Sequence, residues 1–447
     1  MQNVITQQDL AAFAARFAAA PAGRVAMHAV TNNGLLKSAL NQEALRATTH
    51  HFSTSLTQGD ITSQAKSGRC WMFAATNCMR YQMIRRFGLK TFELSQNYPL
   101  FYDKLEKSNY FLENILSTLD EPVAGRLVAH LLADPLGDGG QWDMFVNLVE
   151  KYGAVPKEAM PETAVSSATS EMVQSMTEKL REDACILRTL HGQGKSMAEL
   201  RAAKDAMMAE LYGILCICLG CPPQKFDLEF TDQNGRFTRD EGLTPKAFCE
   251  KYVAMDLNDY VSLINAPTAD KPFHRSYTVK YLGNVAGGRP VRYLNLPVER
   301  LKQVAAAQLK DGEPVWFGSD VGKSSDRESG LLDTALYDRE SLLGTRFGMD
   351  KGQRLTYGQS LMTHAMVLMG VDQDSAGNFL RWRVENSWGK DCGRDGWYVM
   401  SDDWFTQYTY QVVVHKKYLT AEELAAYEAE PIALEPWDPM GSLARAR

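Results

Sequence analysis

The sequence of 447 residues has few cysteines, no long apolar run and no excess of basic residues. Its eight cysteines are irregularly spaced, which is unlike a disulfide framework and favours reduced thiols. No apolar stretch approaches the ~20 residues that a bilayer-spanning helix requires. Residues 1–24 lack a basic start, and Asp9 and Arg16 interrupt their apolar run, so they predict an amphipathic helix rather than a signal peptide. We therefore expect a soluble, cytoplasmic protein with no membrane partner.

The charge balance gives no basic field across the whole surface. The formal net charge is −6, and 23% of the residues are charged, as in ordinary globular proteins. Nothing in this composition attracts polyanions, so nucleic acid is not an expected partner. A non-enzymatic ring that binds nucleic acid through a local basic face is an alternative, which salt-dependent binding of single-stranded DNA would identify.

The chain changes its hydrophobic period along its length. Helical spacing dominates the first half, with two helices expected over 170–212, split at residues 191–194. After residue 360 the period becomes two, and the segments MTHAMVLMGV, NFLRWRVENSW and GWYVMS predict strands. Helices followed by strands indicate an α+β protein.

Cys70 is the first candidate for catalysis. It follows Gly68 and opens a run in which Met72, Thr76 and Met79 recur at helical spacing. The N-terminus of a helix favours the thiolate, which is the nucleophilic form of cysteine. By itself the pattern is more typical of a buried, inert thiol than of a nucleophile.

Three further residues complete a catalytic arrangement. His364 starts one predicted strand and Asn386 ends the next, and a hairpin turned at 374–378 would place them side by side. The Asn386 carbonyl could then orient the imidazole, and Trp388 could shield their hydrogen bond from water. The Gln64 amide and the Cys70 N–H could form a two-donor oxyanion hole. We therefore predict Cys70, His364, Asn386 and Gln64 as catalytic residues.

These residues resemble the papain-like cysteine peptidases. The motifs are Gln64…Cys70-Trp71, His364 and Asn386-Ser387-Trp388-Gly389, and the segments QAKSGRCW and GGQWD look like the bleomycin hydrolase/aminopeptidase C branch. The resemblance implies a two-subdomain fold with a helical left part and a β-barrel-like right part. It also implies a homohexamer, peptide substrates that pair with Gly139 and Gly140, and Trp388 beside the substrate.

The same resemblance suggests a domain plan and an exopeptidase. We expect a terminal carboxylate, here on Arg447, to anchor the substrate's amino group from a C-terminal arm in the cleft. The tail at 445–447 extends beyond the point where relatives stop, and it could block the cleft or require trimming. The expected segments are an N-terminal extension packed on the core (1–60), a helical catalytic subdomain (61–165), a helical insertion with oligomer contacts (166–290), a β-rich catalytic subdomain (291–430) with a second insertion at about 320–358, and the arm (431–447).

Some departures and alternatives remain. Ser67 and Gly137 stand where secreted relatives hold a disulfide, which agrees with a reducing compartment. The thiols at 216–221 lie in an apolar helical run without a nearby histidine, so we expect buried helix thiols, with no metal and no cofactor. The predicted function is removal of N-terminal residues from peptides. The alternatives are an endopeptidase, if the arm leaves the cleft open, and a cysteine-dependent acyltransferase.

Overall fold

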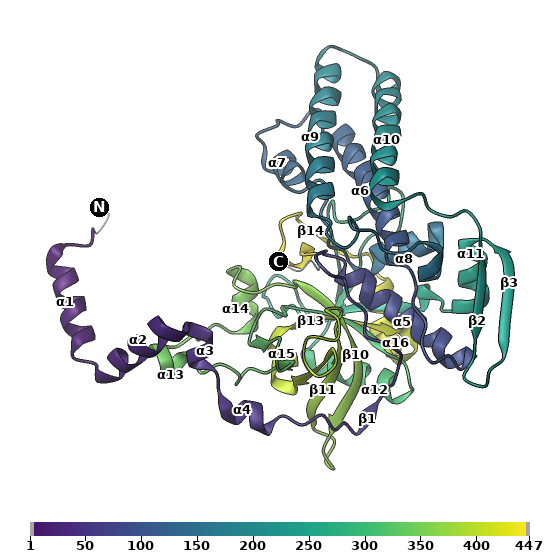
Figure 1. Ribbon diagram of the computed structural model, residues 1–447. Coiled ribbons are helices and arrows are strands. Elements are labelled where there is room, and N and C mark those ends of the chain that lie inside the picture. The colour runs from purple at the N-terminus through teal and green to yellow at the C-terminus, as the bar shows by residue number, and fades with distance from the viewer. Residues whose placement is uncertain (1–3, 444–447) are drawn as a thin grey trace.

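The computed structural model describes residues 4–443 and has the α+β architecture expected from the sequence (Figure 1). A helical part and a mixed β-sheet pack against each other, and helix α5 (Cys70–Phe87) lies between them. The helical part also contains α6 (Asn97–Ser117), α7 (Arg126–Ala133) and α8 (Trp142–Tyr152).

Helix α5 begins at the predicted nucleophile and is buried along nearly its whole length. Its first turn contains no acidic residue, and Arg85 and Arg86 in the last turn complement the helix dipole. Gly88 ends the helix in the left-handed conformation, with φ of 59°. Because α5 packs on β10 (His364–Gln373), the start of the helix lies near the start of the strand.

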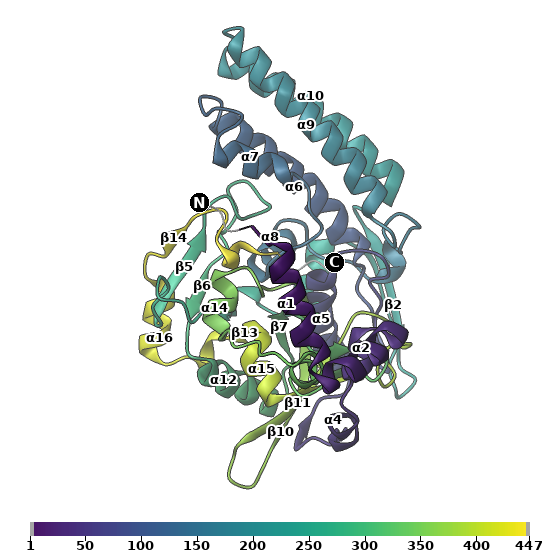
Figure 2. The ribbon, with the colours of Figure 1, turned by 90° about the vertical axis from the view of Figure 1, so that its left-hand side faces the viewer.

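The main sheet has the strand order β14-β5-β6-β4-β13-β7-β10-β11-β12-β9-β8, and β1 pairs with β10 outside this path. β10 and β11 form the predicted hairpin, which turns at Asp374–Asn378. Helices α12, α15 and α16 cover the sheet (Figure 2). The strands are β1 (Thr54–Ser55), β4 (Tyr260–Ile264), β5 (Arg275–Val279), β6 (Tyr293–Asn295), β7 (Val315–Ser319), β8 (Ser325–Asp326), β9 (Leu331–Leu332), β11 (Phe379–Glu385), β12 (Trp397–Ser401), β13 (Thr409–His415) and β14 (Ile432–Leu434), and the helices are α12 (Val298–Lys310), α13 (Arg339–Leu343), α14 (Lys351–Thr356), α15 (Asp402–Tyr408) and α16 (Ala421–Glu428).

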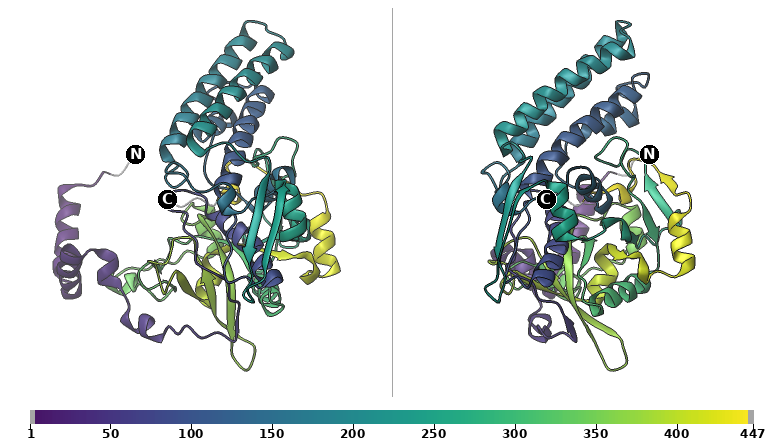
Figure 3. Two further views of the ribbon diagram at one scale, coloured as in Figure 1. Left: turned by 45° about the vertical axis from the view of Figure 1, so that its right-hand side comes forward. Right: turned by 90° about the vertical axis from the view of Figure 1, so that its right-hand side faces the viewer.

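The predicted pair of helices projects from the helical part as a hairpin (Figure 3). The first helix, α9 (Ser170–Gly192), ends inside the predicted break at 191–194, and the second helix is α10 (Met197–Leu219). Ser196 caps the N-terminus of α10 with a capping box. The rest of 166–290 is not helical as expected. β2 (Phe226–Thr231) and β3 (Phe237–Leu243) form a separate hairpin, α11 (Pro245–Phe248) follows, and β4 and β5 belong to the main sheet. β4 is buried on both faces, so its sequence lacks the alternation that identifies a strand.

The N-terminal segment also differs from the expectation that 1–60 packs on the core. α1 (Gln7–Ala18) and α2 (Pro21–Asn33) contain no buried residue, and α1 stands away from the body of the molecule (Figure 1). Their apolar side chains, including Phe13, Phe17 and Val25, are exposed. α2 touches α13, and the remaining contacts with the body are made further along the chain, by α3 (Leu35–Ala39), α4 (Gln42–Ala47) and β1. The two helices form locally, and among residues 4–443 nothing covers their apolar side chains fully.

The C-terminal segment crosses from the sheet toward the helical part. β14 pairs in parallel with β5, and Asp438 forms an ion pair of 2.8 Å with the buried Lys271. Arg126 of α7 lies 3.7 Å from the ring centroid of Trp437. This segment is therefore docked at several points. No helix within 4–443 is long and apolar enough to cross a membrane.

A buried ion pair joins the two parts behind the predicted catalytic residues. The Arg80 guanidinium on α5 lies 2.9 Å from the Glu385 carboxylate at the end of β11, and both side chains are inaccessible to solvent. Asn77 also donates to Glu385. Because burial raises the pKa of Glu385 even beside Arg80, the carboxylate depends on these donors.

We predict that Arg80→Met lowers the free energy of unfolding by about 3–5 kcal/mol, because it leaves a buried carboxylate without its cation. Chemical denaturation followed by fluorescence would measure this. Lys390→Met is the matched control, since its ion pair with Asp60 is exposed and contributes little. Equal destabilisation by both variants would contradict the prediction.

Candidate active site

Cys70 lies at the first position of α5 and is fully buried. The backbone N–H groups of Trp71, Cys70 and Ala365 all stabilise its sulfur. Ala365 directly follows His364 on β10, so the structure places the sulfur beside the start of that strand. The structure thus brings residues 70 and 364, which are distant in sequence, to one place.

Burial dominates the protonation of this pair. It raises the pKa of the Cys70 thiol to about 12, against the lowering effect of the backbone N–H groups, and the charge of Asp138 raises it further. Burial also lowers the pKa of His364 to about 4, although its hydrogen bond to Asn386 opposes the change. Both directions favour an uncharged thiol and imidazole, so burial here outweighs the stabilisation of the thiolate that we expected from the helix N-terminus.

The hydrogen bonds of Asn386 fix the tautomer of His364. Asn386 Oδ1 accepts the backbone N–H of Ser387 at 2.8 Å, so this atom is the carbonyl oxygen of the amide. His364 Nε2 lies 2.9 Å from the same oxygen and must therefore donate its hydrogen to it. The remaining ring nitrogen, Nδ1, has no hydrogen-bond partner among the described residues and carries the basic lone pair. The geometry provides a general base without adding a buried charge.

Trp388 covers this hydrogen bond, as the sequence suggested. Its indole stacks on the His364 ring with centroids 4.8 Å apart and an angle of 29° between the planes. The Arg327 guanidinium lies 4.5 Å from the centroid of the indole ring. Arg327 comes from the predicted second insertion, and its charge contributes to the low pKa of His364.

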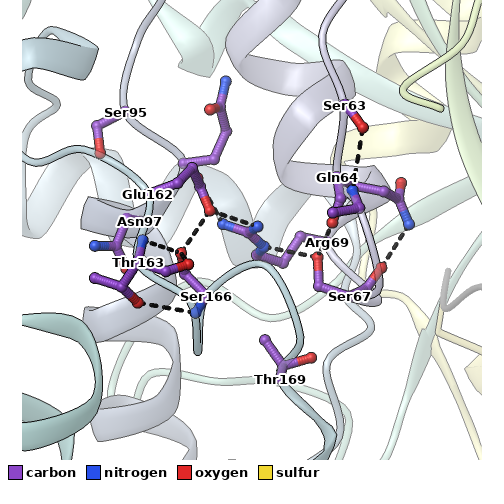
Figure 4. A network of polar contacts seen from close by, with 12 residues as sticks. Ser63, Gln64, Ser67, Arg69, Ser95, Asn97, Glu162, Thr163, Ser166 and Thr169 are labelled. Atoms are coloured by element: carbon purple, nitrogen blue, oxygen red, sulfur yellow. Dashed lines mark hydrogen bonds and ion pairs between the residues drawn. The ribbon is translucent and has the colours of Figure 1, made fainter. Parts of the chain in front are cut away.

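The Gln64 side chain is held at both ends of its amide. Its Oε1 accepts the Ser387 hydroxyl at 2.7 Å, and its Nε2 donates to the Ser67 carbonyl at 2.6 Å (Figure 4). The Gln64 backbone N–H also donates to the Ser387 carbonyl. An amide nitrogen has two hydrogens, so one donor of Gln64 Nε2 remains for a ligand after Ser67 is satisfied.

Gly139 and Gly140 lie next to the nucleophile helix. A Cβ on Gly140 would meet the Trp71 indole at 2.4 Å, so this position requires glycine. Trp71 Nε1 donates to the Asp138 carbonyl, and the Gly139 carbonyl accepts Lys107 Nζ at 2.7 Å. The segment is therefore fixed against α5 and α6 before any substrate arrives.

The described part of the arm ends close to these residues. The Ser442 carbonyl accepts from Gln141 Nε2 at 2.8 Å, and the Ser442 hydroxyl donates to the Met362 carbonyl at 2.6 Å. Gln141 follows Gly140, and Met362 precedes His364 by two residues. A cavity of ≈ 450 Å³ beside the arm is lined by residues that include Ser442, Leu443 and Met362. Arg447 and the basic tail 445–447 lie outside the described residues.

Several residues that support the site were not predicted from the sequence as functional residues. Asp138 accepts the Gly68 N–H at 3.0 Å and pairs with the buried Lys104 at 2.6 Å, so it connects the loop before Cys70 to α6. Ser387 orients Gln64, and Lys107 orients Gly139. Ser387 lies inside the Asn386–Gly389 motif and Asp138 directly precedes GGQWD, but nothing in the sequence spacing indicated Lys104 and Lys107.

The other thiols form no disulfide among the described residues. Cys216 and Cys218 are half-buried and Cys221 is exposed, so the expectation of buried helix thiols is wrong for Cys221, which lies beyond the end of α10. Within residues 4–443, no group of three or more His, Cys, Asp and Glu side chains could hold a metal ion.

Comparisons with known proteins place this chain in a family. Residues 4–441 match the Peptidase C1-like family. The chain is 52% identical to Aminopeptidase C of Streptococcus thermophilus over 417 residues, which cover 93% of this chain and 94% of the relative. It is 47% identical over 444 residues to Aminopeptidase C of Listeria monocytogenes, covering 99% of this chain and 100% of the relative.

A solved structure supports the same assignment. The crystal structure of PepW from Lactobacillus rhamnosis HN001 superposes with a TM-score of 0.98 at 52% identity, covering 99% of this chain and 100% of that one. The resemblance to papain-like cysteine peptidases of the aminopeptidase C type is thereby confirmed. The chain belongs to the Peptidase C1-like family.

Proposed function

We propose that this protein is a cysteine aminopeptidase that removes N-terminal residues from peptides. The observation that carries the proposal is the basic Nδ1 of His364, held in one tautomer by Asn386 at the strand end where the Cys70 sulfur lies. The names of its relatives agree with this activity.

The mechanism begins with a proton transfer. His364 Nδ1 takes the thiol proton as the Cys70 sulfur attacks the scissile carbonyl, so the costly charges arise only when the substrate has entered. The Cys70 N–H and the second Gln64 N–H stabilise the oxyanion. The imidazolium then protonates the leaving amine, which departs and leaves a thioester. Water, deprotonated by His364, attacks the thioester and restores the thiol.

The arm supports cleavage at free N-termini. Residues 432–443 pair with β5 and reach both Gln141 and Met362, so they flank the site next to Gly139 and Gly140. We propose that the arm closes the end of the cleft where an endopeptidase would bind further substrate residues, and that Gly139, Gly140 and Trp388 contact the substrate. Arg447 would supply the carboxylate that binds the substrate's amino group.

The proposal includes a homohexamer in the cytoplasm. The exposed apolar side chains of α1 and α2 support assembly, because isolated amphipathic helices gain stability only by covering this face. Exposed α9 and α10 surfaces in the predicted insertion are further candidates for contacts between copies. A reducing compartment suits a catalytic thiol.

We predict that Cys70→Ala abolishes hydrolysis of aminoacyl-arylamides, because no other group can form the thioester. Gln64→Ala should lower kcat by about 10²–10³-fold, the usual effect of removing one oxyanion donor. Steady-state kinetics with purified enzyme measure both effects. Substantial activity in Cys70→Ala would refute the proposed nucleophile, and an unchanged kcat in Gln64→Ala would refute the oxyanion hole.

We predict that the acidic limb of kcat/KM lies well below pH 6.5. Burial lowers the pKa of His364 to about 4, so the basic imidazole persists through mildly acidic pH and is lost as the pH falls toward 4. A pH–rate profile would measure the limb. In Arg327→Met the limb should move toward neutral pH, because the charge of Arg327 lowers the pKa of His364. A wild-type limb near 6.5 would contradict this assignment.

We predict that the arm determines the preference for free N-termini. A chain ending at residue 434 should hydrolyse N-blocked peptides at least about tenfold faster than full-length protein, because the cleft is then open at that end. A chain ending at 444 tests the tail separately. It still ends in a carboxylate but lacks the residues that could block the cleft, so we expect its activity on free aminoacyl-arylamides to exceed that of the full-length protein. Unchanged ratios of blocked to free substrate in the first truncation would show that the arm does not select the substrate.

A further inference from the structure

The Arg69 side chain, directly before the nucleophile, is completely buried. Its guanidinium makes two parallel hydrogen bonds to Glu162, with Nη1–Oε1 at 2.9 Å and Nη2–Oε2 at 2.8 Å (Figure 4). It also lies 5.1 Å from the ring centroid of Phe73. Burying a guanidinium is costly, so this pairing needs the full set of hydrogen bonds that it makes.

The third donor of Arg69 points toward the predicted oxyanion hole. Arg69 Nε donates to the Ser67 hydroxyl at 2.8 Å. Because a guanidinium can only donate, Ser67 Oγ must accept here. The single hydrogen of the Ser67 hydroxyl is then donated to the backbone carbonyl of Gln64 at 2.6 Å. The Ser67 carbonyl in turn accepts from Gln64 Nε2. Ser67 therefore connects Arg69 to both the backbone and the side chain of Gln64, through its hydroxyl group to the Gln64 backbone and through its carbonyl to the Gln64 amide.

The other end of the network is also fixed. Glu162 Oε2 accepts the Ser166 hydroxyl at 2.6 Å, and the Lys66 backbone N–H donates to the Ser167 carbonyl at 2.9 Å. The turn at 162–168 thus holds the 64–69 loop at two points. Burial raises the pKa of Glu162, but the hydrogen bonds and charge of Arg69 outweigh this effect and keep the pKa below its ordinary value.

The loop needs such support because its backbone is strained. Ala65 has φ of 50°, in the left-handed region that non-glycine residues rarely adopt. Ala65 adjoins Gln64, so relaxation of this residue would displace the amide. An oxyanion donor is effective only when it is fixed in place before the negative charge develops.

We propose that Arg69, held by Glu162, is a positioning residue that sets the oxyanion donor Gln64 through Ser67. This inference rests on the proposed peptidase function. Arg69 touches neither the substrate nor the Cys70 sulfur in this role. It acts on the step in which the carbonyl oxygen becomes negative, and so on kcat more than on KM.

The test is a double-mutant cycle between Arg69→Met and Gln64→Ala, assayed with an aminoacyl-arylamide. Arg69→Met alone should lower kcat by about 10–100-fold and change KM by less than about threefold, as expected for a misplaced catalytic group. In the Gln64→Ala background the same substitution should lower kcat by less than about threefold, because the group on which it acts is gone. Arg300→Met, which breaks the bidentate pair with Glu423 between α12 and α16, is the matched control and should leave kcat unchanged.

Alkylation of Cys70 by iodoacetamide provides a readout that does not use the oxyanion hole. Its rate should stay within about twofold of wild type in Arg69→Met, since the thiol and His364 keep their places. If Arg69→Met does not fold, Glu162→Gln provides the milder variant, with the same pattern and a smaller loss. Circular dichroism would establish folding for each variant.

The outcomes separate the two proposals. An unchanged kcat in folded Arg69→Met, a full loss that persists in the Gln64→Ala background, or an equal fall in alkylation rate would overturn the positioning role. Absence of hydrolysis by wild type, or hydrolysis that survives Cys70→Ala, would instead overturn the peptidase function.

Discussion

The packing of α5 on β10 is the contact on which the rest of the site depends. It brings the N-terminus of a buried helix to the first residue of a strand that lies far along the chain. The helix supplies the sulfur and the strand supplies the imidazole. The Arg80–Glu385 pair ties α5 to β11, the strand next to β10, about three turns further along the helix, so a second fixed contact supports the packing on which the site depends.

Burial determines the protonation states of Cys70 and His364. Burial opposes both the thiolate and the imidazolium, and the nearby Asp138 carboxylate adds to the cost of the thiolate. Asn386 orients the imidazole with a neutral amide, so this hydrogen bond adds no negative charge that would stabilise a protonated histidine. Such a site keeps its reactants neutral and relies on prearranged N–H groups when charge develops. The Asp138–Lys104 pair and the Arg69–Glu162 pair provide that arrangement from outside the reacting atoms.

Local sequence was sufficient for the elements that have a clear period or a clear boundary. The α9–α10 split, the start of α5 and the β10–β11 hairpin follow from capping, glycine and turn residues, and the structure confirms them. The motif residues Cys70, His364, Asn386 and Gln64 do lie together. β4 was missed because burial on both faces removes the alternation of apolar and polar residues. The exposure of α1 and α2 was missed because amphipathic periodicity does not say which surface covers a helix. Lys104 and Lys107 act by reaching backbone carbonyls of another segment, which no spacing rule reveals.

The arm at 432–443 is covalently linked to the site beside which it lies, and this link has a consequence for inhibition. Since it belongs to the same chain as the site beside which it lies, its effective concentration there is set by the polymer and not by the amount of enzyme in solution. Diluting the protein cannot release it. A molecule that binds in the same space must therefore displace the arm, whose local concentration is constant. The apparent affinity of that molecule will be independent of enzyme concentration.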